Sequence, residues 1–300
     1  MCKFIIFLAS VGKIWYDTNP KGRDDTKKHP LIRLLLVFLA ICLLLLWDSS
    51  HRLVTTDYDI RFSNLPEAFD GFTVVQLSDL HGAQYGTDNS RLVSRVAALQ
   101  PDLIALTGDY IESPDQLDVT AALIRQLSDI APVTFTSGNH DWASGAIKDL
   151  KQTVTDCGGT YLSNEAIPLT RAGETILLVG VEDPNSRADM IRPDALLQQL
   201  SAEHPDQFVI LQAHRNDFIT KYPALPCDLI LTGHGHGGVI RLPFIGGLIG
   251  TERSLFPRYD AGLFQSGRYT MVVSRGLGDA PLLPRFLNNP EIVSVTLHKK

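Results

Sequence analysis

Seven short apolar runs, rich in branched residues and each followed by glycine or polar residues, constrain the fold of this chain most strongly. They are FTVVQLS (72–78), DLIALT (102–107), PVTFTS (132–137), ILLVG (176–180), FVILQ (208–212), DLILT (228–232) and YTMVVS (269–274). Helix-like stretches lie between several of them, at 89–100, 118–130, 144–158 and 192–204. Such runs predict buried strands. Because the strands alternate with helices, we expect an α/β domain whose sheets are covered on both faces.

Asp, Asn or His follows five of these predicted strands. The sequences are Asp79-Leu80-His81, Gly108-Asp109, Gly138-Asn139-His140-Asp141, Ala213-His214 and Gly233-His234-Gly235-His236. Ligands of α/β sheets bind beside the carboxyl ends of the strands, so we expect these side chains to converge. A single D-x-H motif is weak evidence, because Asp often caps a helix and His is often an ordinary loop residue. Seven candidate ligands at five strand ends together predict a metal site.

The string GHGHGG (233–238) also matches the G-x-G-x-x-G pattern of dinucleotide-binding turns, with Asp260 downstream as the ribose-binding acid. That interpretation requires a helix directly after the glycines. The residues that follow are VIRLP, which open no helix, so the dinucleotide interpretation fails. The glycines instead leave room for His234 and His236 to turn toward separate metal ions.

In this order, the motifs D-x-H, G-D, G-N-H-D, A-H and G-H-x-H resemble those of the calcineurin-like metallophosphoesterases. The resemblance covers approximately residues 70–297. GHGHGGVIRLPFIG, VSRGLG, PRF and the closing PEIVSVTL look like the membrane-anchored bacterial phosphodiesterase branch of that family. The resemblance implies a four-layer αββα sandwich, in which helices flank two central sheets, and hydrolysis of a phosphate ester.

The resemblance also implies two divalent metal ions (Mn, Zn or Fe, with Mg as a further option). The ligands of the first would be Asp79, His81, Asp109 and His236, and those of the second Asp109, Asn139, His214 and His234. Asp109 would bridge the two ions. Imidazole and carboxylate suit these metals, and two cations about 3.5–4 Å apart activate water and clamp phosphate oxygens.

His140 has no metal in this assignment, and the resemblance makes it the group that stabilises or protonates the leaving oxygen. Imidazole suits that task because it exchanges protons near neutral pH. Glu112, in GDYIE, stands where relatives often have Asp three residues after the bridging residue. We predict that Glu112 pairs with His140 and that Asp141 has a structural role.

Arginine binds phosphate oxygens through two N–H groups at once. Arg275, in VSRGLG, is the first candidate for such a contact. Arg215 and Arg241 are weaker candidates, and each of the three has the alternative of pairing with a surface acid.

The stretch RLPFIGGLIGTERSLFP (241–257) combines glycines with large apolar residues, among them Phe244, Ile245, Leu255 and Phe256. We expect a strand and loop that pack on the core. The alternative is an apolar rim that faces the bilayer or an acyl chain, which would suit a tethered enzyme acting on a lipid headgroup.

The run LIRLLLVFLAICLLLLW, from Leu31 to Trp47, is interrupted only by Arg33. About 17 residues lie at the short end of what spans a bilayer, with Arg33 and Trp47 suited to the two interfaces. The run lacks the polar spacing of a core helix, and the residues after it lack the small residues of a signal-peptide cleavage site. It therefore predicts one uncleaved transmembrane helix.

Residues 1–33 hold seven Lys or Arg, whereas the twenty or so residues after Trp47 hold only Arg52 and Arg61. The positive-inside rule predicts a cytoplasmic N-terminus at the cell (inner) membrane and a periplasmic or extracellular catalytic domain. Beyond residue 33, 20 of the 27 basic and 30 of the 33 acidic residues remain. This acidic domain is a poor partner for nucleic acid. Cys157 and Cys227 are open to two interpretations, a disulfide or two buried thiols.

The predicted organisation is a cytoplasmic segment 1–30, an anchor 31–47, a linker 48–69 and a metallophosphoesterase domain 70–300. The favoured function is hydrolysis of a phosphodiester or phosphoanhydride of a membrane or envelope lipid or related metabolite. A UDP-acylglucosamine pyrophosphatase and a protein phosphatase of the same family are alternatives. A non-catalytic scaffold that keeps the fold is a third.

Overall fold

The computed structural model describes residues 30–251, 254–279 and 283–300, apart from the side chain of Ala188. Residues 1–29, nearly all of the predicted cytoplasmic segment, therefore lie outside the described residues. The chain divides into two compact units, Met1–Leu44 and Leu45–Lys300.

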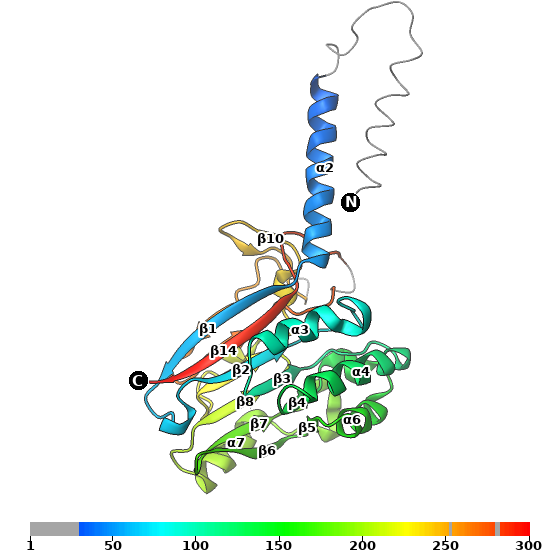
Figure 1. The fold of residues 1–300 in the computed structure, drawn as a ribbon. Coiled ribbons are helices and arrows are strands. Elements are labelled where there is room, and N and C mark those ends of the chain that lie inside the picture. The colour runs from blue at the N-terminus through cyan, green and yellow to red at the C-terminus, as the bar shows by residue number, and fades with distance from the viewer. Residues whose placement is uncertain (1–29, 252–253, 280–282) are drawn as a thin grey trace, which may run out of the picture. The chain divides into compact units, whose positions relative to one another are not determined.

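Helix α2 (Pro30–His51) contains the predicted anchor (Figure 1). Its length and composition are sufficient to cross a membrane, and none of its most apolar window is buried, unlike a core helix. At 1.5 Å per residue its 22 residues rise about 33 Å, close to the ~30 Å thickness of a hydrocarbon core.

The unit Leu45–Lys300 contains two six-stranded sheets. The first sheet has the strand order β1-β14-β2-β3-β4-β5. Its strands are β1 (Val54–Phe62), β14 (Glu291–Lys299), β2 (Phe72–Leu77), β3 (Leu103–Thr107), β4 (Val133–Thr136) and β5 (Thr160–Tyr161). All neighbours are parallel except β14 and β2. The long connections between β2, β3, β4 and β5 carry the helices α3 (Ser90–Ala98), α4 (Leu117–Ser128), α5 (Asn139–Ala143) and α6 (Ile147–Asp156).

The second sheet has the order β12-β13-β9-β8-β7-β6. Its strands are β12 (Gly262–Gln265), β13 (Thr270–Val273), β9 (Leu229–Thr232), β8 (Val209–Gln212), β7 (Glu174–Gly180) and β6 (Glu165–Arg171). The four central strands are parallel, and both edge strands are antiparallel to their neighbours. Helices α7 (Pro193–Glu203) and α8 (Phe218–Lys221) belong to this half. A separate small hairpin pairs β10 (Arg241–Leu242) with β11 (Gly246–Gly247).

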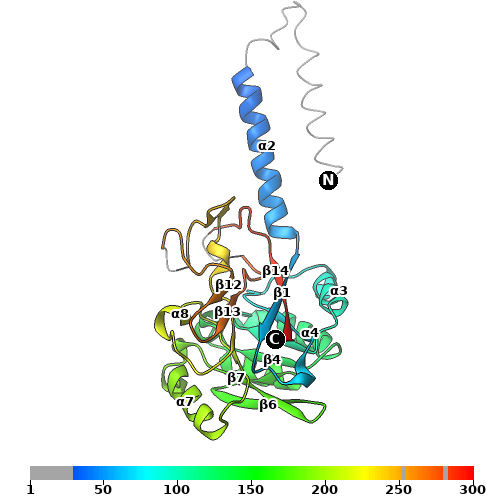
Figure 2. The same ribbon diagram turned by 90° about the vertical axis from the view of Figure 1, so that its left-hand side faces the viewer.

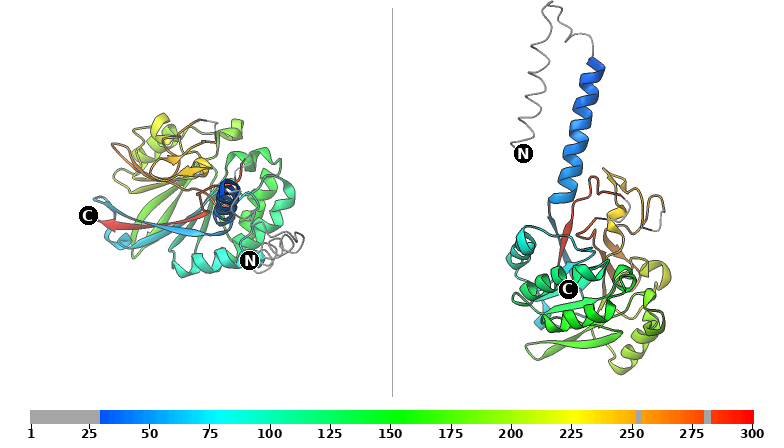
Figure 3. Two further views of the ribbon diagram at one scale, coloured as in Figure 1. Left: turned by 90° about the horizontal axis from the view of Figure 1, so that it is seen from above. Right: turned by 90° about the vertical axis from the view of Figure 1, so that its right-hand side faces the viewer.

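Three apolar clusters separate four layers. The first joins α3, α4 and α6 to the outer face of the first sheet, with Leu92, Leu123 and Leu150 among its members. The second lies between the two sheets, and the third joins the second sheet to α7 and α8. Figure 2 shows α7 and α8 on the opposite side from α3 and α4, and Figure 3 shows the same layers from two further directions. The predicted αββα sandwich is confirmed.

The segment 48–69, predicted as a linker, contributes a strand to the first sheet. β1 pairs with β14 along its whole length, and both Leu53 and Ile60 are buried. β1 is an edge strand, so its exposed positions carry Asp and Arg, and its sequence, VTTDYDIRF, looks like a polar connection. The domain therefore begins within a few residues of the end of α2.

Cys157 and Cys227 are free thiols in the structure. Both are buried, and they belong to different apolar clusters, on the outer faces of the first and second sheets respectively. Of the two interpretations left open by the sequence, the structure has two buried thiols.

Candidate metal centre

The polar residues that follow the strands converge at one edge of the two sheets. From the segments that follow β2, β3 and β4, the first sheet supplies Asp79, His81 and Asp109 in loops and Asn139 and His140 at the start of α5. From the loops after β8 and β9, the second sheet supplies His214, His234 and His236. The inner faces of the sheets pack on each other, so the carboxyl ends of these strands meet.

Asp79, His81 and His236 form one group of possible metal ligands, with one ligand atom from each residue within 4.8 Å of the others. His236 Nε2 lies 3.2 Å from His81 Nε2 and 3.4 Å from Asp79 Oδ1. The three side chains are almost entirely buried. Such convergence of imidazole nitrogens on a carboxylate in a dry site is the arrangement that binds a cation.

Asp109, His214 and His234 form a second group. His214 Nε2 lies 3.0 Å from Asp109 Oδ2 and 3.1 Å from His234 Nδ1. Asp109 Oδ2 is also 3.9 Å from His81 Nε2, which belongs to the first group. Asp109 thus stands between the two groups, where the sequence predicts a bridging carboxylate.

Two features of the surrounding atoms fit a cation at the second group. Asn139 Oδ1 is buried without a hydrogen-bond partner, so it has an acceptor free to coordinate. His214 Nδ1 lies 2.8 Å from the carbonyl oxygen of Thr107. The carbonyl oxygen holds a proton on Nδ1 and orients the ring so that Nε2 faces Asp109, as carbonyl groups commonly do for metal-bound histidines.

The backbone of this site is strained. Five of the seven predicted ligands have positive φ angles although none is glycine: Asp79, His81, Asp109, His234 and His236, with φ from 44° to 63°. Non-glycine residues adopt this region rarely and at a cost, and such residues cluster at functional sites. The local strain therefore supports a functional site at these strand ends.

Glycine lets the loops after β3 and β4 pack against each other. A Cβ on Gly108 would lie 2.5 Å from the backbone nitrogen of Gly138, and one on Gly138 would collide with Asp109. The close approach also allows the His140 N–H to donate to Asp109 Oδ1 at 2.8 Å. Asp109 is therefore held by the next loop of the same sheet.

Burial raises the pKa of the Asp79 carboxyl. Burial acts in the same direction on Asp109, but the neighbouring His214 and His81 hold the pKa of Asp109 below its usual range. Burial, together with neighbouring cationic groups, lowers the pKa of His234 and of His236 well below the usual value. These two imidazoles are therefore neutral at neutral pH, which is the form that binds metal ions.

Glu112 contacts both His81 and His140. Its Oε1 lies 3.0 Å from His81 Nδ1 and 3.8 Å from His140 Nδ1. The shorter contact is thus with His81 rather than with the predicted partner His140. The contact with His81 lowers the pKa of Glu112, so this group is a carboxylate at neutral pH.

Asp141 holds the loop that carries Asp109. Its two carboxylate oxygens accept hydrogen bonds from the backbone N–H groups of Asp109, Tyr110, Ile111 and Gly138, at 2.8–3.0 Å. The side chain is fully buried and lies in neither group of candidate ligands. These contacts agree with the structural role predicted for Asp141.

The geometry is matched by comparison with known proteins. Residues 72–238 match the family described as calcineurin-like phosphoesterase. The chain belongs to this family. The match includes all of the residues described above at the strand ends.

Several relatives are similar in sequence to this metallophosphoesterase over most of their own length. The uncharacterized metallophosphoesterase YkuE of Bacillus subtilis is 35% identical over 255 residues, which cover 82% of this chain and 86% of the relative. Phosphodiesterase YaeI of Escherichia coli is 29% identical, covering 75% and 82% respectively. UDP-2,3-diacylglucosamine pyrophosphatase LpxG of Chlamydia trachomatis is 27% identical, covering 76% and 85%. The chain is accordingly a metal-dependent phosphoesterase, and the scaffold alternative is set aside.

Arg215 is the predicted phosphate-binding residue with the most direct contact with the candidate ligands of the metallophosphoesterase. Its Nη1 lies 3.1 Å from His234 Nε2. Asp183 accepts from Arg215 Nε at 2.6 Å and from Nη2 at 3.2 Å. This bidentate pair fixes the guanidinium at the edge of the second group.

Arg241 and Arg275 are each paired with a carboxylate. Arg241 donates to Asp260 at 2.7 Å and to the carbonyl oxygen of Gly237 at 2.8 Å. Arg275 donates to Glu291 at 2.9 Å. Asp260, the acid of the failed dinucleotide interpretation, thus anchors the segment that follows the last two candidate ligands.

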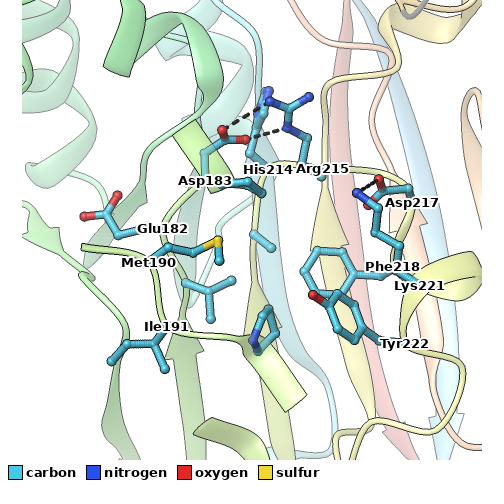
Figure 4. A pocket seen from close by; sticks show the side chains of 14 residues that line it. Glu182, Asp183, Met190, Ile191, His214, Arg215, Asp217, Phe218, Lys221 and Tyr222 are labelled. Atoms are coloured by element: carbon cyan, nitrogen blue, oxygen red, sulfur yellow. Dashed lines mark hydrogen bonds and ion pairs between the residues drawn. The ribbon is translucent and has the colours of Figure 1, made fainter. Parts of the chain in front are cut away.

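A pocket opens beside His214 (Figure 4). Met190 and Ile191 line it on one side, and Phe218 and Tyr222 line it on the other. The walls are therefore mostly apolar, while the Asp183–Arg215 ion pair closes the end nearest the candidate ligands.

Two buried glutamines that the sequence analysis did not single out join the two sheets beside the site. Gln76 Nε2, on β2, donates to the carbonyl oxygen of Thr232 on β9 at 2.8 Å. Gln212 Nε2, on β8, donates to the carbonyl oxygen of Leu106 on β3 at 2.7 Å. The available signal was an amide residue in an otherwise apolar strand, two or three residues before a candidate ligand.

We predict that Asp141→Asn lowers the free energy of unfolding by about 1–3 kcal/mol, because one acceptor oxygen becomes an N–H donor that faces backbone N–H groups. Thermal melting of the full chain in detergent measures the loss. The control is Asp115→Asn, at an exposed carboxylate. Equal melting temperatures for the two variants would show that Asp141 does not hold the loop.

Proposed function

We propose that this metallophosphoesterase hydrolyses a phosphodiester or phosphoanhydride of a membrane or envelope lipid, or of a related metabolite, with two divalent metal ions. The observation that carries the proposal is the pair of ligand groups that meet at Asp109. Two adjoining groups suit a pair of ions that act together on one phosphate.

The proposed ligands fall into two sets. The first set is Asp79, His81, Asp109 and His236, and the second is Asp109, Asn139, His214 and His234. The mixture of imidazole nitrogen, carboxylate and amide oxygen suits Mn, Zn or Fe, with Mg as a further option. When bound, such ions polarise a phosphate and activate a water molecule.

The groups around the ligands are proposed to act on the substrate. His140 donates a proton to the leaving oxygen, since its ring is partly exposed and stands edge-on to His81 with centroids 4.9 Å apart. Glu112 is a positioning residue that orients both imidazoles. Arg215 binds a phosphate oxygen that does not react. Arg241 and Arg275 remain weaker candidates for that contact, because each is already paired with a carboxylate.

The names of the relatives narrow the class of substrate. YaeI is named a phosphodiesterase, and LpxG is named a UDP-2,3-diacylglucosamine pyrophosphatase. Both names describe cleavage of a phosphate linked on two sides, so we favour a phosphodiester or phosphoanhydride over a monoester.

The proposed location is the cell membrane, with α2 as a single-pass anchor and the catalytic domain on the periplasmic or extracellular side. The excess of Lys and Arg before α2, compared with the residues that directly follow it, supports this orientation. Nucleotide-linked sugars are cytosolic, so this orientation favours an envelope phosphodiester over the UDP-acylglucosamine alternative.

We predict that an alkaline phosphatase reporter fused to the C-terminus is active and that a fluorescent-protein reporter at the same position is dark. The physical reason is export of the domain across the membrane. As a control, the same reporters fused after residue 29 should give the reverse pattern. A bright fluorescent C-terminal fusion would place the domain in the cytoplasm.

We predict that chelation abolishes hydrolysis of bis-p-nitrophenyl phosphate and that Mn²⁺ or Zn²⁺ restores it. The diester should be hydrolysed with a higher kcat/KM than p-nitrophenyl phosphate, as expected for a phosphodiesterase. A colorimetric assay of both substrates on the full chain measures the difference. Preference for the monoester, or full activity after chelation, would contradict the proposed function.

We predict that His140→Ala lowers kcat by about 10²–10⁴-fold on a diester with a poor leaving group. The loss should be much smaller for the p-nitrophenyl diester, whose leaving group needs little protonation.

We predict that Glu112→Ala lowers kcat less than His140→Ala does and displaces the pH–rate profile. Glu112→Gln should retain part of the activity through its remaining oxygen. An unchanged profile in Glu112→Ala would remove Glu112 from the account.

A further inference from the structure

The segment after the last two candidate ligands exposes large apolar side chains. Phe244 is fully exposed, and Leu255 is 69%, Ile245 63% and Phe256 57% exposed. Among the described residues from 53 to 300, these are the four most exposed large hydrophobic side chains. The prediction that this stretch packs on the core is therefore wrong for these four residues. An exposed apolar cluster of this kind marks an interaction surface.

All four side chains belong to one folded element, here called the apolar hairpin and comprising residues 241–251 and 254–257. Phe244 and Ile245 lie in the turn between β10 and β11. Leu255 is bridged to Ile249, and the Phe256 N–H donates to the carbonyl oxygen of Leu248 at 3.0 Å. The backbone hydrogen bonds thus hold both exposed pairs on a common support.

The base of the apolar hairpin is hydrogen-bonded to a short segment near the C-terminus, residues 286–289. The Arg241 N–H donates to the carbonyl oxygen of Phe286 at 2.9 Å, and Ile240 is bridged to the same residue. Asn288 Nδ2 donates to the carbonyl oxygens of Val239, at 3.0 Å, and His236, at 2.7 Å. The segment therefore supports both the hairpin and a candidate metal ligand.

The segment 286–289 is also hydrogen-bonded to the last turn of α2, which belongs to the unit Leu45–Lys300. Asn289 Nδ2 donates to the backbone oxygen of Asp48 at 2.8 Å, and Arg52 Nη2 donates to Asn289 Oδ1 at 3.1 Å. Asn289 is only three residues from Phe286. Three residues span at most about 11 Å between their Cα atoms, so the hairpin base lies close to Asp48.

Asp48 is the first polar residue after the apolar run that ends at Trp47. In a helix that spans a bilayer, this transition from Trp to Asp lies at the membrane–water interface. Apolar side chains near such a point reach the headgroup and upper acyl region, which takes apolar surface to a depth of about 5–10 Å. An exposed apolar cluster close to this point is therefore suited to contact with lipid.

We propose that the apolar hairpin inserts Phe244, Ile245, Leu255 and Phe256 into the surface of the bilayer in which α2 is anchored. The inference rests on the membrane anchoring in the proposed function. It deepens that function, because contact through Asn288 puts His236 at the same end of the domain. A phosphodiester of a lipid headgroup then reaches the candidate metal centre while its acyl chains stay in the membrane. Figure 1 shows β10 at the end of the domain where β1 begins.

The test uses the full-length chain with Phe244→Trp, reconstituted into phosphatidylcholine vesicles that carry bromine atoms on their acyl chains. The tryptophan emission added by the substitution is taken as the difference from the wild-type chain. We expect its maximum to lie to the blue of that of tryptophan in water. We expect its intensity to be at least twofold lower in brominated than in unbrominated vesicles. The matched control is Lys148→Trp, an exposed position on α6, whose added emission should be unchanged.

Flotation of the same vesicles separates the two proposals. If the chain floats with the vesicles but the Phe244→Trp emission is not quenched, the hairpin inference is overturned and the anchoring stands. If the chain does not float, the anchoring fails and the inference fails with it. Leu255→Trp repeats the measurement at the second exposed pair if Phe244→Trp changes the melting temperature of the domain.

Discussion

The buried carboxylate of Asp109 is the interaction on which the site depends. It is almost fully excluded from water, and a buried charge is tolerated only when paired and hydrogen-bonded. Its partners come from both sheets, since His140 lies at the start of α5, directly after β4, and His214 lies in the loop after β8. The neutralisation of one carboxylate therefore requires the two sheets to present the carboxyl ends of their strands to each other.

The rest of the domain fixes that meeting point. The side chains of Gln76 and Gln212 form hydrogen bonds between the two sheets next to the site. Asp141 accepts hydrogen bonds from the backbone around Asp109. The positive φ angles of the candidate ligands carry a conformational cost that this surrounding structure must offset. The ligands are accordingly held in place by the fold, as preorganised catalytic sites require.

Much of the site could be predicted from the sequence because parallel strands buried on both faces leave long apolar runs, and ligands follow directly at their ends. β1 was not predicted because its alternate residues are exposed to solvent, so its sequence looks like that of a loop. The contact of Glu112 with His81 could not be predicted, since it depends on the path of a loop rather than on spacing. The exposure of Phe244 was only the alternative in the sequence analysis, because apolar composition alone does not distinguish a core segment from an exposed apolar surface.

The most direct test of the account is the number of metal ions bound per chain, measured by elemental analysis of the full-length protein and its variants. The account predicts about two ions for the wild-type chain, about one for His236→Ala, and fewer than one for Asp109→Asn, because only Asp109 serves both groups. Melting temperatures would show that the variants are folded. Two ions retained by a folded Asp109→Asn variant would contradict the claim that this carboxylate joins the two sites.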